Sequence, residues 1–218
     1  MSRVKTLLCG GICLFAFILW TYLIQTIDVQ PLGQQGTDIG FATFNIWFHG
    51  ITGVHMIIYH ITDWAGLVPV FICFGFGVFG LIQLIKRRSL IKVDCDIILL
   101  GVYYVIVIFG YLIFEMIPIN YRPIPIAGFM EASYPSSTTL LVLSVMPTLV
   151  FQIQRRAKSA LVRRLIWVFS IGFSAFMVVG RTISGVHWFT DIVGAVFLSA
   201  GLFFLYKAAV LWCEKTKA

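Results

Sequence analysis

The chain has 218 residues, of which 60% are hydrophobic and 11% are charged. Soluble domains carry about 25% charged residues, so this composition excludes an ordinary soluble domain. Six apolar runs each reach about 18–22 residues, the length at which a helix crosses a bilayer. Strands of a membrane barrel would instead read as alternating segments of about 10 residues. We therefore predict an all-α, polytopic membrane protein in which residues 1–218 form a single transmembrane domain.

The apolar runs give the predicted elements in chain order. The first span covers residues 6–26, and we expect it to be retained, because it is too long for a signal-peptide core and no small-residue cleavage site follows. After a polar, glycine-rich loop, residues 41–66 place polar side chains at helical spacing, which predicts an amphipathic helix lying in the membrane interface. The five remaining spans are predicted over residues 67–85, 97–117, 135–153, 165–181 and 190–211.

The net charge of +7 could indicate a nucleic-acid partner, but the basic residues are arranged as in a membrane protein. With six spans both termini lie on one side, and every Lys and Arg except Arg122 and Arg181 falls on that side. The positive-inside rule makes it the cytoplasmic side. Arg122 and Arg181 therefore face the extracytoplasmic side, and the simplest reason is an anion that both bind. We expect membrane lipids around the protein and no nucleic-acid partner.

The cysteines and histidines do not indicate a metal site. Five cysteines occur inside apolar runs or near their ends: Cys9, Cys13, Cys73, Cys95 and Cys213. They form no CxxC pair and no Cys/His cluster, so neither a disulfide framework nor a zinc site is indicated. His49, His55 and His60 are not one helical turn apart, which favours packing on a polar face over metal binding. We expect no metal and no cofactor.

A first polar island, Tyr134 to Thr138, opens the fourth predicted span. Pro135 suits the first turn of a helix, because its missing N–H would be unpaired there. Ser133 would then be the N-cap. The N–H groups of residues 136–138 would point out of the helix end and could bind an anion. The alternative is a membrane helix that is simply well capped.

A second polar island runs from Gly180 to Asp191. His187 and Asp191 are one helical turn apart, so the carboxylate could accept from one ring nitrogen and leave the other facing a substrate. Arg181, at the end of the fifth span, could hold phosphate oxygens in a bidentate fork. A histidine oriented in this way is a competent nucleophile toward phosphorus. The alternative is a structural His–Asp cap, which is less favoured because ionisable residues at membrane depth are costly.

Three segments resemble the signature of the type 2 phosphatidic acid phosphatase (PAP2) superfamily, whose pattern is K-x6-R-P, P-S-G-H and S-R-x5-H-x3-D. They are Arg122–Pro123, Pro135–Ser136–Ser137–Thr138 and Arg181 to Asp191. Order, spacing and outward placement fit, and the resemblance covers essentially the whole chain. It implies that His187 forms a phosphohistidine and that Asp191 orients it. It also implies a phosphate site made of Arg122, Arg181, Ser136, Ser137 and Thr138.

The chain departs from that pattern at its first, second and third segments. Glu115 stands in place of the Lys, Ser137 and Thr138 replace Gly-His, and Gly180 replaces the Ser. The family's second-segment His protonates the leaving oxygen, whereas threonine is not an acid at working pH. General acid catalysis contributes about 10²–10⁴-fold. Either Glu115 or Glu131 supplies the proton, if burial favours its protonated form, or the leaving group needs little help, as in a polyprenyl diphosphate.

The resemblance implies a membrane phosphatase that hydrolyses a lipid phosphate or polyprenyl diphosphate at the extracytoplasmic face without a metal. A lipid phosphotransferase would use the same His187 chemistry to pass the phosphoryl group to another acceptor. A catalytically weak relative that binds or moves a phospholipid is a third interpretation, supported by the missing Lys and His. A channel or secondary transporter would need charged residues in mid-span, which the sequence lacks. The lipid and the oligomeric state are left open.

Overall fold

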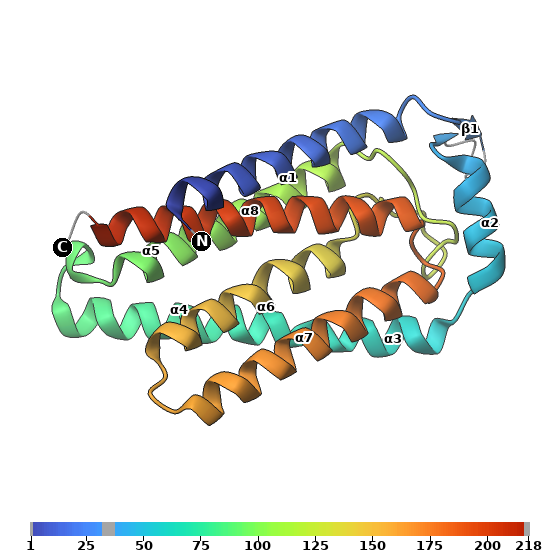
Figure 1. Cartoon of the computed structure of the whole chain (residues 1–218). Helices are drawn as coiled ribbons and strands as arrows, with labels where there is room; N and C mark the ends of the chain where they lie inside the picture. The colour runs from blue at the N-terminus through green and yellow to red at the C-terminus, as the bar shows by residue number, and fades with distance from the viewer. Residues whose placement is uncertain (1, 32–37, 216–218) are drawn as a thin grey trace.

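The computed structural model describes residues 2–31 and 38–215. Within these ranges the chain is almost entirely helical (Figure 1). The helices are α1 (Arg3–Ile24), α2 (Ala42–Thr52), α3 (Met56–Ala65), α4 (Leu67–Arg87), α5 (Cys95–Met116), α6 (Ser137–Arg156), α7 (Ala160–Ile183) and α8 (Phe189–Lys215), with a short 3-10 turn, η1 (Leu90–Lys92). Two short strands, β1 (Gln30–Pro31) and β2 (Asp38–Ile39), pair antiparallel before α2.

Six helical segments among the described residues are long and apolar enough to cross a membrane. They are α1, α3 together with α4, α5, α6, α7 and α8. This confirms the predicted all-α membrane fold with six spans. Large apolar side chains such as Phe15, Phe74 and Phe109 are exposed on the outer faces of these helices, as contact with lipid tails requires.

The predicted helix over residues 41–66 is two helices in the structure. α2 lies across one end of the bundle, whereas α3 runs on into α4 as one 32-residue span, Met56–Arg87 (Figure 1). The second span therefore begins about three turns before its predicted start at residue 67. The physical reason is that α3 exposes large apolar side chains, Ile57, Ile61 and Trp64, which lets it continue the apolar surface of α4.

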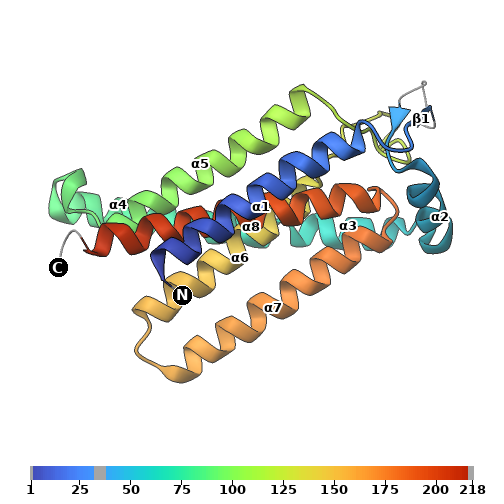
Figure 2. The same ribbon diagram turned by 45° about the horizontal axis from the view of Figure 1, so that its top comes forward.

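α8 is the central helix of the bundle: it contacts α1, α5 and α6, and both views show it among them (Figures 1 and 2). The main core is formed by apolar side chains of these four helices, including Phe17, Leu100, Leu140 and Leu198. A smaller cluster joins α6 to α7: Val142, Met146 and Met177. This packing brings the N-terminal ends of α6 and α8 and the C-terminal end of α7 to the same end of the bundle.

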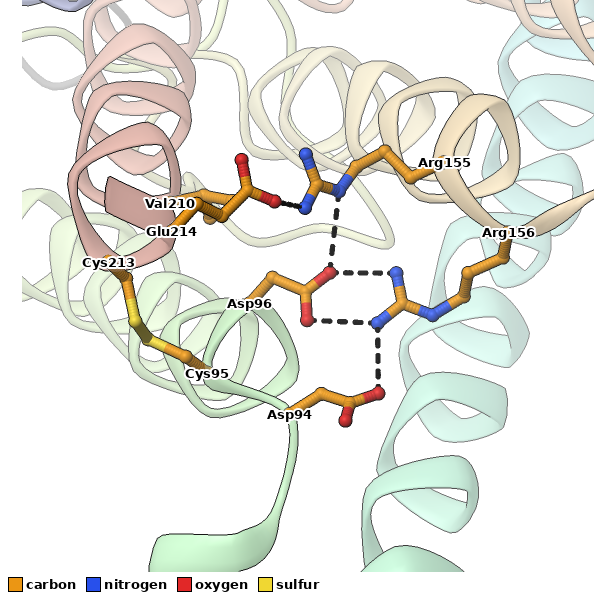
Figure 3. A pocket seen from close by; sticks show the side chains of 8 residues that line it. All are labelled: Asp94, Cys95, Asp96, Arg155, Arg156, Val210, Cys213 and Glu214. Atoms are coloured by element: carbon orange, nitrogen blue, oxygen red, sulfur yellow. Dashed lines mark hydrogen bonds and ion pairs between the residues drawn. A yellow bond between two sulfur atoms is a disulfide. The ribbon is translucent and has the colours of Figure 1, made fainter. Parts of the chain in front are cut away.

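A charged cluster joins α5, α6 and α8 at the opposite end (Figure 3). Asp96 accepts from both terminal nitrogens of Arg156, at 2.7 and 2.9 Å, and Arg155 forms an ion pair with Glu214. Figure 3 shows the two arginines of α6 facing Asp96 of α5. These contacts fix the ends of three helices to one another.

The expectation of no disulfide is wrong for one pair of cysteines. Cys95, at the start of α5, and Cys213, in the last turn of α8, form a disulfide across 118 residues of sequence (Figure 3). No local motif marks such a pair, because only the meeting of two helix ends in the fold brings the sulfurs together. The other three cysteines are free: Cys9, Cys13 and Cys73.

Candidate active site

The candidate site lies at the end of the bundle crossed by α2 (Figure 1). Three connecting segments meet there: residues 117–136, 184–188 and 53–55. Backbone hydrogen bonds join them, from the His55 N–H to the Ser184 carbonyl at 3.0 Å and from the Ser136 N–H to the Asp191 carbonyl at 3.2 Å. The two polar islands, far apart in the sequence, are therefore neighbours in the fold.

His187 lies in the tight connection between α7 and α8 and is 3% exposed. Gly185 before it has a φ of 72°, and a Cβ there would lie 2.2 Å from the Gly53 carbonyl oxygen, so only glycine fits this turn. Nδ1 of His187 lies 3.2 Å from the carbonyl oxygen of Ser133. Because a carbonyl can only accept, Nδ1 carries the proton and Nε2 keeps its lone pair.

Asp191, in the first turn of α8, is fully buried. Its Oδ2 lies 3.7 Å from Nδ1 of His187 and accepts a 2.8 Å hydrogen bond from the Trp188 N–H. Its Oδ1 accepts from Nδ2 of Asn120 at 3.2 Å. The carboxylate thus lies on the Nδ1 side of the ring, beside the closer Ser133 carbonyl. Sequence reasoning missed Asn120, because no pattern in its loop marks it.

Arg122 reaches the same ring from the loop before α6. Its Nη1 lies 3.5 Å from Nε2 of His187, and its Nε lies 3.0 Å from Oε2 of Glu131. The loop doubles back on itself, because the Arg122 N–H donates to the Glu131 carbonyl at 3.1 Å and the Ser133 N–H donates to the Asn120 carbonyl at 2.9 Å. The loop thus carries all three residues that contact the His187–Asp191 pair from this side: Asn120, Arg122 and Ser133.

Arg181, in the last turn of α7, is 1% exposed. Its Nη1 lies 3.4 Å from Oγ1 of Thr62 and 3.7 Å from Oδ1 of Asp63. Its guanidinium lies over the Tyr59 ring, 5.0 Å from the centroid. All three partners belong to α3, which sequence reasoning had assigned to an interfacial helix and left out of the site.

Burial, and then the charges of Arg122 and Arg181, hold the pKa of His187 well below its usual value of 6.5. The imidazole is therefore neutral at neutral pH, the form that a nucleophile needs. Both arginines are almost fully buried, and Nη1 of Arg122 lies 3.5 Å from Nε2 of this neutral ring. Buried guanidiniums with few partners are strong binders of phosphate oxygens, so this arrangement favours an anion beside Nε2.

A family model described as the PAP2 superfamily matches residues 97–215, more than half of the chain. The chain belongs to the PAP2 superfamily. The match confirms the resemblance seen in the sequence. The fold is also similar to a crystal structure described as the first transmembrane PAP2 type phosphatidylglycerolphosphate phosphatase from Bacillus subtilis, with a TM-score of 0.69, 14% identity and coverage of 95% of this chain and 96% of that one. No curated protein matches this chain.

The second PAP2 segment, Pro135 to Thr138, is placed differently from the prediction. Ser133 is not the N-cap of the helix; α6 begins at Ser137, and Ser136 is its N-cap. Ser136 has a ψ of 111°, outside the helical range, and its N–H is bonded to the Asp191 carbonyl. Its hydroxyl donates to Thr139 at 3.0 Å. The half-buried residues 137 and 138 are left at the helix start, where backbone N–H groups have no helical acceptor.

Gly180, which replaces the serine of the third PAP2 segment, sets the distance between α7 and α3. A Cβ at this position would lie 2.6 Å from Cγ2 of Thr62, closer than packed side chains approach. The absence of a side chain therefore lets the two helices come together. This close approach places the partners of Arg181 on α3 within reach of its guanidinium.

Two cavities flank the start of α6 in this PAP2 protein. The smaller, of about 130 Å³, is polar, and its lining includes Glu115, Arg122, Glu131 and Ser137. The larger, of about 520 Å³, lies between α4, α5 and α6 and is lined mainly by apolar side chains. Its lining also includes Ser137, Thr138 and Asp63, whose Oδ1 lies 3.7 Å from Nη1 of Arg181. Among the described residues, no group of three or more His, Cys, Asp or Glu side chains could hold a metal ion.

Proposed function

We propose that this PAP2 protein is an integral-membrane phosphatase that hydrolyses a lipid phosphate or diphosphate through a phosphohistidine at His187. The observation that carries the proposal is the convergence of two buried arginines on a neutral, tautomer-fixed imidazole. Nε2 of His187 holds the lone pair and lies 3.5 Å from Nη1 of Arg122. The charge of Arg181, a second buried arginine at this end of the bundle, also lowers the pKa of the ring.

The residues divide the chemistry between them. Arg122, Arg181 and the first N–H groups of α6 hold the phosphate oxygens, as charge-assisted donors do. Nε2 of His187 attacks the phosphorus, and Ser133 and Asp191 stabilise the positive charge that develops on the ring. Water then attacks the phosphorus, the P–N bond breaks, and phosphate is released. Glu115 and Glu131 remain candidate proton donors, since both line the polar cavity that contains Arg122.

A lipid substrate is supported by the larger cavity. Its lining is mostly apolar, with residues such as Leu67, Leu141 and Val145, and it includes Asp63, which lies 3.7 Å from Arg181 of the proposed phosphate site. A phosphate bound there would direct the rest of its molecule into an apolar space between membrane helices. Lipids of this kind include phosphatidic acid, polyprenyl diphosphates and phosphatidylglycerol phosphate, the substrate after which the Bacillus subtilis phosphatase of similar fold is named.

The charge distribution supports an orientation with both termini in the cytoplasm and the site on the extracytoplasmic side. The ends of α4 and α6 that lie opposite the site carry the basic residues, among them Arg87 and Arg156. The orientation is tested by fusing to the C-terminus a reporter that folds only outside the cytoplasm. An active reporter would reverse the proposed orientation.

Phosphate release from purified protein in detergent tests the proposed activity. The substrates are phosphatidic acid, phosphatidylglycerol phosphate, a sphingoid phosphate and a polyprenyl diphosphate. We expect release by the wild type and by His60→Ala, an exposed histidine on α3, and none by His187→Ala. Transfer of label to a second lipid without free phosphate would favour a phosphotransferase. Lipid binding that survives His187→Ala, without release from any substrate, would favour a binding or transport role.

A further inference from the structure

Asp63 stands between the proposed phosphate site and the apolar cavity. It lies near the end of α3, and its Oδ1 is 3.7 Å from Nη1 of the buried Arg181. The same residue lines the apolar cavity together with Ser137 and Thr138. The end of α3 packs on the start of α6, since a Cβ on Gly66 would lie 3.5 Å from Cγ2 of Thr138.

The position of the leaving oxygen follows from where the two parts of a lipid phosphate would lie. The phosphorus would be held by the arginines beside Nε2 of His187, and the tail would fill the apolar cavity. The oxygen that joins them then lies at the polar end of this cavity. Asp63 is the one carboxylic acid among the described residues that line it. Thr138, where the PAP2 pattern has an acid, belongs to the same wall.

Glu115 and Glu131 are less well placed for this oxygen. Both line the separate polar cavity of about 130 Å³ rather than the apolar one. Glu131 is also paired with Nε of Arg122 at 3.0 Å. An acid in the polar cavity would contact the phosphate away from the lipid tail and from the P–O bond that breaks.

We propose that Asp63 is the acid that protonates the leaving oxygen, an inference that rests on the proposed function. In the first step a bond forms between Nε2 of His187 and phosphorus, the P–O bond to the lipid breaks, and the proton of Asp63 goes to the leaving oxygen as the alcohol departs. In the second step water attacks phosphorus and gives a proton to the Asp63 carboxylate. The P–N bond breaks, and phosphate leaves with His187 neutral again.

The ion pair between Asp63 and Arg181 explains how Asp63 acquires the proton that it donates. A bound dianionic phosphate competes with Asp63 for the guanidinium of Arg181. Once the phosphate has taken that place, the Asp63 carboxyl group lies against the phosphate, and a proton between the two relieves the repulsion of like charges. The half-exposed side chain of Asp63 is open to solvent, from which a hydronium ion supplies this proton.

Two substrates with the same tail test the proposal. Phosphatidic acid has an alcohol leaving group that needs a proton, whereas diacylglycerol diphosphate has a phosphate leaving group that needs little help. We expect Asp63→Asn to lower kcat for phosphatidic acid by about 10²-fold or more, and for the diphosphate by less than about 10-fold. Asp63→Glu should recover part of the loss with phosphatidic acid. Thr62→Val, which removes another partner of Arg181 but no acid, should change both substrates to the same extent.

The outcomes separate this inference from the proposed function. If the wild type releases phosphate and His187→Ala does not, but Asp63→Asn changes both substrates equally or neither, Asp63 is only a counter-ion of Arg181 and the acid lies elsewhere. If the wild type releases phosphate from neither substrate nor from the wider panel, the proposed function fails and the assignment of Asp63 fails with it. Elution of each variant as the wild-type species on size-exclusion chromatography establishes that it has folded.

Discussion

Nη1 of Arg122 lies 3.5 Å from Nε2 of His187, so a buried cation faces the ring nitrogen that carries the lone pair. Protonation of the ring would break this contact, because Nε2 would then be a donor that faces another donor. The contact therefore holds the imidazole neutral and presents a guanidinium where the oxygens of a bound phosphate would lie.

Replacing Arg122 by glutamine should change both the rate and its pH dependence. Loss of a donor to the transferring phosphoryl group should lower kcat/KM by about 10²–10³-fold. Arg122 is one cause of the low pKa of His187, so its removal raises that pKa toward 6.5. Because neutral imidazole is the reactive form, activity is lost as the pH falls through this pKa. The acid limb of kcat/KM, well below pH 6.5 in the wild type, should therefore move to higher pH.

The control for this variant is Arg164→Gln, which removes an exposed arginine of α7 far from the site. It should leave the pH profile unchanged. An acid limb at the same pH in Arg122→Gln and the wild type would contradict the assignment of His187 as the titrating group.

Asn120→Ala should lower activity without affecting the binding of phosphate. Its Nδ2 donates to Oδ1 of the buried Asp191, and hydrogen bonds to charged groups contribute about 1.5–3 kcal/mol. Loss of this hydrogen bond, which orients Asp191, should reduce kcat by about 10-fold or more. Competitive inhibition by inorganic phosphate should be unchanged, since Arg122 and Arg181 remain. A weaker inhibition constant together with an unchanged kcat would place Asn120 in substrate binding instead.

Gly180→Ser should reduce activity, although it restores the residue of the PAP2 pattern. A Cβ at this position would lie 2.6 Å from Cγ2 of Thr62, and overpacking of this kind costs about 1–3 kcal/mol. Displacement of α3 would take Thr62 and Asp63 away from Arg181. The matched control is Gly172→Ser in the same helix, where a Cβ would meet nothing within 4 Å. Thermal denaturation and turnover should separate the two variants; equal behaviour would show that α3 does not depend on this contact.

Asp96→Asn should lower stability and leave the chemistry intact. Asp96 binds both terminal nitrogens of Arg156, and its side chain is 10% exposed, so its loss leaves a poorly solvated guanidinium without its main partner. We expect a loss of about 2 kcal/mol or more. Asp94→Asn, whose side chain is 38% exposed, should cost less. The first measurement is the midpoint of thermal denaturation in detergent. The second is kcat at a temperature below that midpoint. A large fall in kcat would mean that the charged cluster at the Asp96 end of the bundle affects the active site.

The fold could be predicted because its main determinant is the length of the apolar runs, which the membrane enforces. The start of the second span was placed too late, because Asp63 and Tyr59 give α3 the pattern of an interfacial helix, whereas in the structure they face Arg181 of another helix. The His187–Asp191 pair is local, so helical spacing was enough to suggest it. Asn120 and the Cys95–Cys213 disulfide depend on contacts between distant segments, and no local pattern encodes them.

The most direct test of the central claim is rapid quenching of the reaction with a lipid whose phosphate is labelled, followed by location of the label on the protein. We expect acid-labile, alkali-stable label on His187 of the wild type, and none on His187→Ala under the same conditions. Turnover by the wild type without labelled protein at any quench time, or label that persists in His187→Ala, would contradict the proposed phosphohistidine mechanism.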